Sequence, residues 1–245
     1  MINLELDDNI GDILNSSMSN WQILLEEISN SNNNILISAH MTTKHRLEAA
    51  RLFLSILNST KGQPFIDTVN FLRRAAIESI ISNIASALDS LAHEINQIYD
   101  FNVAIEKVQI DHFRMQPAKE RNCVRCNLDS LDRDDLKGYL NSELPRAPIP
   151  KNHWYYIFGR YRQHITHRPW LILHLAAEGI FLPDDPTIPD PTIKPQYDTI
   201  AHQIVYPNYT ENREVSSYCT LSLEKVIQVV ENAYSHLRNS IQNPD

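Results

Sequence analysis

Three arginines and two histidines crowd into residues 160–170, RYRQHITHRPW, of a chain that is acidic as a whole. An arginine guanidinium donates paired hydrogen bonds to the oxygens of a phosphate or a carboxylate, and a histidine exchanges protons near neutral pH. Arg162 and His167 are the two residues of this stretch that we expect to point at one spot. Side chains of these two types in one place can bind an anionic group and move a proton.

The elements around this pair must bring the two side chains together. We predict one helix over 152–165, which carries Arg162, and a second helix over 169–179, which Pro169 opens because proline suits a first helical turn. Proline also disfavours helical geometry at the residue before it, so His167 is expected on a bend between the two helices. In a helix that ran straight through, five residues at about 100° each would leave the two side chains on different faces. The bend is therefore the feature on which the site depends.

The charge of the chain is uneven. The 245 residues carry a formal charge of -8, which argues against a protein that coats nucleic acid with its whole surface. Between Arg114 and Arg168, however, eleven basic residues stand against six acidic ones. A local basic surface is therefore expected on an acidic protein.

Helices dominate the rest of the pattern. Apolar residues recur at steps of three and four through 64–100 and again near the C-terminus, which places them on one face of an amphipathic helix. Shorter segments with the same spacing follow residues that can cap a helix, Ser19 in one case and Thr42 or Thr43 in the other. We predict an all-α helical bundle built on long amphipathic helices.

We expect the chain to form one domain over residues 1–245. Residues 64–180 and 216–242 supply its core helices, and residues 1–62 form an N-terminal helical elaboration. Prolines punctuate an irregular loop near 183–207.

Several chemistries are absent from the sequence. The five glycines form no GxGxxG or GxxxxGK[ST] pattern, and there is no HExxH or GxSxG motif. We therefore expect no nucleotide cofactor and no bound metal. No apolar run is long enough to cross a membrane, and the chain shows no secretory leader pattern, so a cytoplasmic protein is expected.

Two cysteines have the spacing of half a zinc site. Cys123 and Cys126 stand in CVRC, but a structural zinc needs four ligands and no second close pair exists. His112, His153 or Cys219 would have to complete the set. Reduced thiols in a loop are the simpler interpretation.

Polar residues also lie along the predicted helix over 64–100. Asp89 and His93 are one turn apart, and Glu94 follows. Such a pair more often makes a hydrogen bond at a helix interface than it binds a ligand. We treat the three as residues that would contact and orient the site residues without touching a ligand themselves.

The stretch RQHITH resembles the R-x4-6-H motif of the HEPN superfamily (higher eukaryotes and prokaryotes nucleotide-binding), with Arg162 and His167 in the motif positions. Residues 84–96, IASALDSLAHEIN, followed by WYYIFGRYRQHITHRP, look like the larger stand-alone bacterial members of that superfamily. The resemblance covers about 64–100, 152–179 and the C-terminal helix. It implies an all-α bundle, and in many members a metal-independent endoribonuclease.

The resemblance also implies site residues and partners. Arg162 and His167 would be catalytic, and the neighbouring Arg160, His164 and Arg168 would bind substrate. RNA is the expected substrate, and it would be cleaved to 2',3'-cyclic phosphate and 5'-hydroxyl ends. A homodimer is expected because two copies of the motif commonly meet in the family, and an antitoxin or another protein partner fits a toxin or defence role.

One position departs from the family pattern. The residue after the motif arginine is commonly a short polar one, whereas here it is Gln163. A second hypothesis therefore stands beside the first. It describes a non-catalytic helical dimer that acts as an RNA- or protein-interaction module, with Arg162 holding a nearby carboxylate and His167 capping a helix end.

Overall fold

A computed structural model of the protein describes most of the chain. The described residues are 18–30, 33–63, 67–108, 110, 124–131, 135–145, 149–151, 153–167, 174–176, 179–183, 196–198, 203–205 and 209–242. For residues 125, 164, 166 and 167, and for the strands up to residue 213, the description covers the backbone alone.

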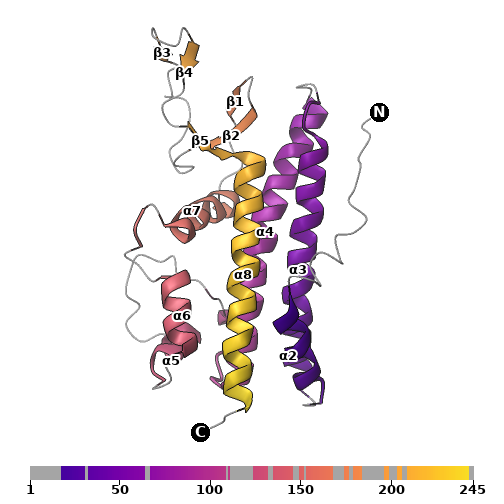
Figure 1. The fold of residues 1–245 in the computed structure, drawn as a ribbon, viewed down its shortest axis with the longest axis vertical. Coiled ribbons are helices and arrows are strands. Elements are labelled where there is room, and N and C mark those ends of the chain that lie inside the picture. Colours follow the sequence, from indigo (N-terminus) through magenta and orange to yellow (C-terminus); the bar gives the residue numbers. More distant parts are fainter. Residues whose placement is uncertain are drawn as a thin grey trace.

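Long helices form the body of the molecule. They are α2 (Ser19–Ser29), α3 (Asn34–Ser59), α4 (Asp67–Ile98) and α8 (Val215–Gln242). They run alongside one another in Figure 1, and α3 and α4 form a long antiparallel hairpin. The all-α helical bundle predicted from the sequence is confirmed.

Shorter helices lie on one side of this bundle. They are η1 (Ile105–Lys107), α5 (Val124–Asp129), α6 (Asp135–Glu143) and α7 (Trp154–His167). In Figure 1, α7 crosses beside α4 and α8, and α5 and α6 lie below it. Arg162 thus belongs to an element that packs against the long helices.

The apolar stripes predicted from spacing form the core. The stripe of α4 is buried along most of its length, at Ile77, Ile80, Ile81, Ile84, Leu88, Leu91 and Ile95. The stripe of α8 is buried at Leu223, Val226, Ile227, Val230, Tyr234 and Leu237. Each of these helices therefore excludes water along one face, which stabilises the bundle in proportion to the apolar area buried.

Short strands occupy the chain between α7 and α8. Strand β2 (Gly179–Pro183) pairs antiparallel with β1 (His174–Ala176) and with β5 (Tyr209–Glu214), and β3 (Gln196–Asp198) pairs with β4 (Gln203–Val205). The register sets Leu175 opposite Ile180. Strand β5 leads directly into α8.

The helix predicted over 169–179 is therefore wrong in its described part. Strand β1 and the start of β2 lie there, whereas Pro169 lies outside the described residues. The segment is a short apolar run between a proline and a glycine, and periodicity cannot distinguish a buried strand from a helix over so few residues. The loop predicted near 183–207 contains β3 and β4, and its remaining residues lie outside the description apart from Pro183.

Two helices begin differently from the prediction. Helix α3 starts at Asn34, because the Asn33 side chain accepts a hydrogen bond from the Leu36 amide at 3.0 Å. Thr42 and Thr43 lie inside this helix. Ser19 was expected to cap α2, but the N-cap is Met18, and Ser19 is the first helical residue. The amides of Asn20 and Trp21 donate instead to the Glu231 carboxylate at 2.9 and 3.0 Å. A carboxylate from α8 thus takes the place of the Ser19 cap expected for α2.

A buried ion pair links the long helices. His40 Nδ1 on α3 lies 2.6 Å from Glu94 Oε2 on α4, and both side chains are fully buried. His40 Nε2 lies 2.9 Å from the Trp21 carbonyl oxygen of α2. A carbonyl only accepts, so Nε2 carries a proton. The other ring nitrogen shares a single proton with the carboxylate.

The second oxygen of Glu94 is also satisfied. Oε1 accepts hydrogen bonds from the Thr43 hydroxyl at 2.5 Å and from the Tyr234 hydroxyl at 3.0 Å. Burial and the charge of Glu94 raise the pKa of Tyr234 well above its ordinary value, so this hydroxyl remains a donor. Trp21, His40, Thr43, Glu94 and Tyr234, here called the buried cluster, join α2, α3, α4 and α8.

Replacing one member of the buried pair should be costly. Glu94→Ala leaves the imidazole, the Tyr234 hydroxyl and the Thr43 hydroxyl without their acceptor in a dry core. We expect the free energy of unfolding to fall by about 3 to 5 kcal/mol, measured by urea denaturation. The exposed Glu26→Ala on α2 serves as a control and should change stability by less than about 0.5 kcal/mol.

The double variant His40→Leu, Glu94→Leu tests the same interpretation by replacing both partners with apolar residues. It removes both partners and leaves no uncompensated charge, so it should be more stable than Glu94→Ala. A double variant as unstable as the single one would show that packing, and not the unpaired charge, sets the cost.

Candidate functional site

Arg162 is held by a carboxylate of the central helix. Its Nη2 donates to Asp89 Oδ2 at 2.7 Å, which brings α7 against α4. The other carboxylate oxygen of Asp89 accepts a hydrogen bond from the Ile110 amide at 3.2 Å. Each side chain of the pair keeps 23% of its surface exposed. The guanidinium is therefore positioned by an ion pair that solvent still reaches.

The titration of the two α4 side chains is shifted by their surroundings. Burial raises the pKa of Asp89 above its ordinary 3.8, although the Arg162 charge and the Ile110 amide oppose that shift. Burial lowers the pKa of His93 below its ordinary 6.5, and the Asp89 charge opposes it. His93 is therefore neutral at neutral pH and can accept a proton.

Asp89, His93 and Arg162 together form a cluster that we call the α4–α7 site. It combines a carboxylate, a neutral imidazole and a guanidinium, and the site is only half-buried. Ionisable groups with shifted pKa values tend to gather at functional sites, although structural ion pairs shift them too. The sequence analysis expected Asp89 and His93 to support the site residues, and the structure places Asp89 in direct contact with Arg162.

The predicted bend at His167 is wrong. Helix α7 continues to His167, so Arg162 and residue 167 belong to one uninterrupted helix. Five residues rotate a helix by about 500°, so the two positions lie about 140° apart around its axis. Without a bend, the backbone of one chain does not turn both positions toward one spot.

The expected substrate-binding residues are only partly described. Arg160 lies on α7 with its guanidinium carbon 6.0 Å from the centroid of the Tyr156 ring, at the outer limit of a cation–π contact. His164 and His167 are placed by their backbone alone, and Arg168 lies outside the described residues. Of the five predicted site residues, the structure thus places the side chain of Arg162 against Asp89 and that of Arg160 beside Tyr156.

Sequence patterns did not single out His40. The signal was its register, since it occupies a position in the buried stripe of α3 with Leu36, Thr43 and Leu47. A histidine in such a position needs a buried partner. That partner, Glu94, lies fifty-four residues away along the chain.

The cysteines differ from the expected reduced thiols in one respect. Cys126 is disulfide-bonded, and Cys123 lies outside the described residues. Cys219 is a free, fully buried thiol whose pKa burial raises to about 12. Within the described part of the chain, no three histidine, cysteine or acidic side chains gather so that they could hold a metal ion.

The helices that the structure describes include none with the length and apolar character needed to cross a membrane. Comparisons of the chain with protein-family models, with curated proteins and with solved structures give no match.

Burial and the Asp89 charge act in opposite directions on the pKa of His93, and a titration can test this. Asp89→Asn removes the charge that raises the pKa of His93 and leaves burial unopposed, so this pKa should fall further. The ring protons of His93 followed by NMR as a function of pH would measure the change. An unchanged or higher pKa in the variant would contradict the assignment of Asp89 as the neighbouring charge.

Proposed function

We propose that the protein is a metal-independent endoribonuclease of the HEPN type, with Arg162 as the residue that binds the scissile phosphate. The observation that carries the proposal is the α4–α7 site, where an ion pair fixes the partly exposed guanidinium of Arg162 on Asp89, one helical turn from the neutral imidazole of His93. The R-x4-6-H motif supports the same assignment. A toxin or defence role, with an antitoxin as partner, follows from the resemblance alone.

The reaction needs no metal because RNA carries its own nucleophile. The 2'-hydroxyl oxygen attacks the neighbouring phosphorus while a histidine takes its proton, and the bond from phosphorus to the 5'-oxygen breaks. A proton returns to that leaving oxygen. The products are a 2',3'-cyclic phosphate and a 5'-hydroxyl. Arg162 would stabilise the negative charge that builds on the non-bridging oxygens.

The proton shuttle that we assign is His167 of a second copy of the chain. Positions 162 and 167 diverge around the straight α7, so a homodimer offers a way for His167 of one copy to approach Arg162 of the other. His93 is the alternative within one chain, since it is neutral and lies one turn from the carboxylate that holds Arg162.

The catalytic assignment can be tested with single-stranded and structured RNA. Arg162→Ala and His167→Ala should each lower the cleavage rate by about a hundredfold or more, and cleavage should persist in EDTA. Arg160→Ala and His164→Ala should cost less, and the exposed Lys151→Ala should match the wild type. The reaction is followed by the appearance of 2',3'-cyclic phosphate ends.

The histidine variants decide between the two shuttles. If His93→Ala abolishes cleavage and His167→Ala does not, the shuttle lies within one chain. Full activity of both histidine variants would mean that neither residue moves the proton. A mixture of Arg162→Ala and His167→Ala chains that regains part of the activity would establish a site shared between two copies.

A second function is favoured by the ion pair itself. Asp89 lies 2.7 Å from Arg162 and offsets its charge, and Gln163 stands where the family commonly has a shorter side chain. These features suit a non-catalytic helical dimer that binds RNA or a protein. RNA that is retained but not cleaved, with an affinity that falls steeply with salt, would favour RNA binding without catalysis. A defined dimer that neither retains nor cleaves RNA would favour a protein-interaction module.

A further inference from the structure

Helix α7 turns different residue types to its two sides. One side packs into the core, where the rings of Tyr161 on α7 and Tyr218 on α8 lie 5.1 Å apart between centroids. Tyr161 is fully buried and Phe158 is 1% exposed. Arg162 lies next to this side, where it meets Asp89 of α4. The opposite side of α7 is turned away from all of these contacts.

Four positions share that opposite side of α7. A helix turns about 100° per residue, and steps of four, three and four keep these positions within about 60° of one another around the axis. They are Tyr156, Arg160, Gln163 and His167. We call them the α7 face. Gln163 is exposed, Tyr156 and Arg160 are partly exposed, and His167 is placed by its backbone alone.

The charge of α7 favours an anionic ligand. Residues 151–167 include Lys151, Arg160 and Arg162 and no acidic residue, in a chain of net charge -8. The carboxylate of Asp89 offsets Arg162, but it meets α7 on the side away from the α7 face. The charge that this helix itself brings is therefore complementary to a polyanion.

The tyrosine of the α7 face restricts the class of ligand. Arg160 follows Tyr156 by one turn, with 6.0 Å between its guanidinium carbon and the centroid of the ring. An aromatic ring stacks on a base that is not paired, and a guanidinium binds phosphate oxygens. In an RNA duplex the bases pair with one another, and proteins contact mainly its shape, sugars and phosphates. A ring beside a guanidinium therefore fits an unpaired strand better than a duplex.

We propose that the α7 face binds an unpaired RNA strand, with a base stacked on Tyr156 and a phosphate held by Arg160. The inference rests on the proposed function, which makes RNA the ligand, and adds the substrate class and a residue that contacts a base. From Tyr156 to His167 the helix rises by about 16 Å, so a strand along this face runs from the tyrosine to the proposed proton shuttle. Arg162 faces α4 and lies off this path, in keeping with a site shared between two copies.

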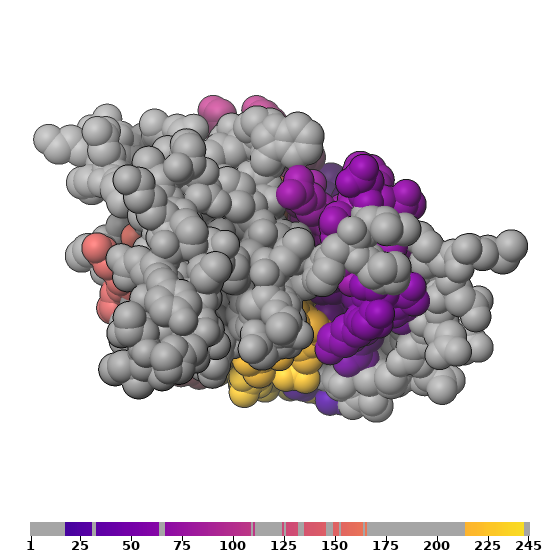
Figure 2. All heavy atoms as spheres, turned by 90° about the horizontal axis from the view of Figure 1, so that it is seen from above, coloured from indigo at the N-terminus to yellow at the C-terminus, as the bar shows by residue number. Residues whose placement is uncertain are grey.

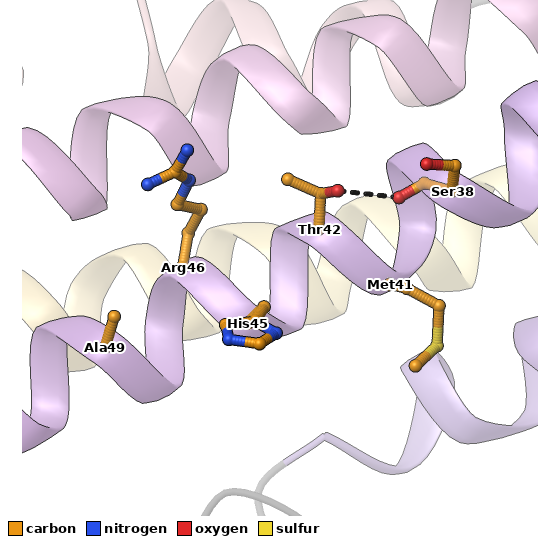
Figure 3. Close-up of a pocket in the computed structure, with 6 residues that line it drawn as sticks. All are labelled: Ser38, Met41, Thr42, His45, Arg46 and Ala49. Atoms are coloured by element: carbon orange, nitrogen blue, oxygen red, sulfur yellow. Dashed lines mark hydrogen bonds between the residues drawn. The ribbon is translucent and has the colours of Figure 1, made fainter.

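The α3 side of the bundle offers a matched control. A shallow pocket of about 400 Å³ on α3 contains Arg46, which points toward α4 in Figure 3 and donates to Asn83 at 3.3 Å. The described lining of this pocket includes no tyrosine, phenylalanine or tryptophan. In Figure 2 the coral atoms of the α7 region lie at the left of the molecule and the purple atoms of α3 and α4 at the right. Arg46 is therefore an exposed arginine remote from the α7 face.

Binding of RNA that cannot be cleaved tests the base contact. A short unpaired RNA with methylated 2'-hydroxyls lacks the nucleophile, so its fluorescence anisotropy reports affinity without catalysis. Tyr156→Ala should lower the affinity of the full chain for this RNA about tenfold, because the base loses the ring on which it stacks. Tyr156→Phe keeps the ring and should bind like the wild type. Phe71→Ala, which removes a 72% exposed ring of α4, should also leave the affinity unchanged.

Arginine variants and duplex RNA test the phosphate contact and the strand class. Arg160→Ala should lower the affinity and reduce its logarithmic dependence on salt concentration by about 0.7, because one phosphate contact is lost. Arg46→Ala should change neither quantity. A duplex of the same sequence should bind more weakly than the single strand, and equal binding of the two would contradict a base stacked on Tyr156.

Crosslinking of the wild-type chain supplies a test that needs no substitution. Unpaired RNA that carries iodouridine should crosslink under ultraviolet light to the peptide that contains Tyr156, as identified by mass spectrometry. Crosslinks confined to other peptides would overturn the assignment. The variants change side chains on the surface of α7, so their melting temperatures should stay within a few degrees of the wild type.

The outcomes separate this inference from the ribonuclease proposal. If the chain cleaves RNA and Tyr156→Ala binds and cleaves like the wild type, the α7 face does not bind the strand, and the proposed function stands. If the chain binds unpaired RNA through Tyr156 and Arg160 but leaves cleavable RNA intact, the catalytic assignment fails and the α7 face stands. A wild-type chain that retains no RNA would overturn both.

Discussion

The fully buried pair of His40 and Glu94 constrains the whole bundle. A carboxylate in a dry core is tolerable only when its oxygens are saturated, and here the imidazole, the Thr43 hydroxyl and the Tyr234 hydroxyl do so. The donors come from two helices other than that of Glu94. A shift of any of these helices by one turn would leave a buried polar group without its hydrogen-bond partner. The cluster therefore selects one helix register among the many that apolar packing alone permits.

Helix α4 connects this core to the candidate site. Glu94 and Asp89 are five residues apart, which turns their side chains to different sides of the same helix. One carboxylate points into the core toward α3 and α8, and the other meets Arg162 on α7. Because α4 is packed between other helices of the bundle, the Asp89 carboxylate has a fixed position. It can therefore orient the Arg162 guanidinium of the shorter helix α7. The position of Arg162 therefore depends on the packing of helices far from it in sequence.

The charges of the α4–α7 site affect how strongly any anionic ligand binds there. Burial raises the pKa of Asp89, and the positive charge of Arg162 opposes that shift. The attraction between the two charges therefore offsets part of the free energy that burial costs each of them. A phosphate that binds Arg162 must compete with this carboxylate.

The sequence by itself determined the helical class and most of the core, since the three- and four-residue spacing of apolar residues in α4 and α8 is a local property that any packed bundle must respect. It also pointed to Arg162. It did not fix the last turn of α7, because Pro169 disfavours helical geometry only at Arg168 and leaves the helix free to continue to His167. Nor could it decide that a carboxylate of α4 would hold Arg162, or that His40 in an apolar stripe would meet Glu94. Those contacts join residues that are more than fifty positions apart, and only the register of packed helices in the tertiary structure brings them within hydrogen-bonding distance.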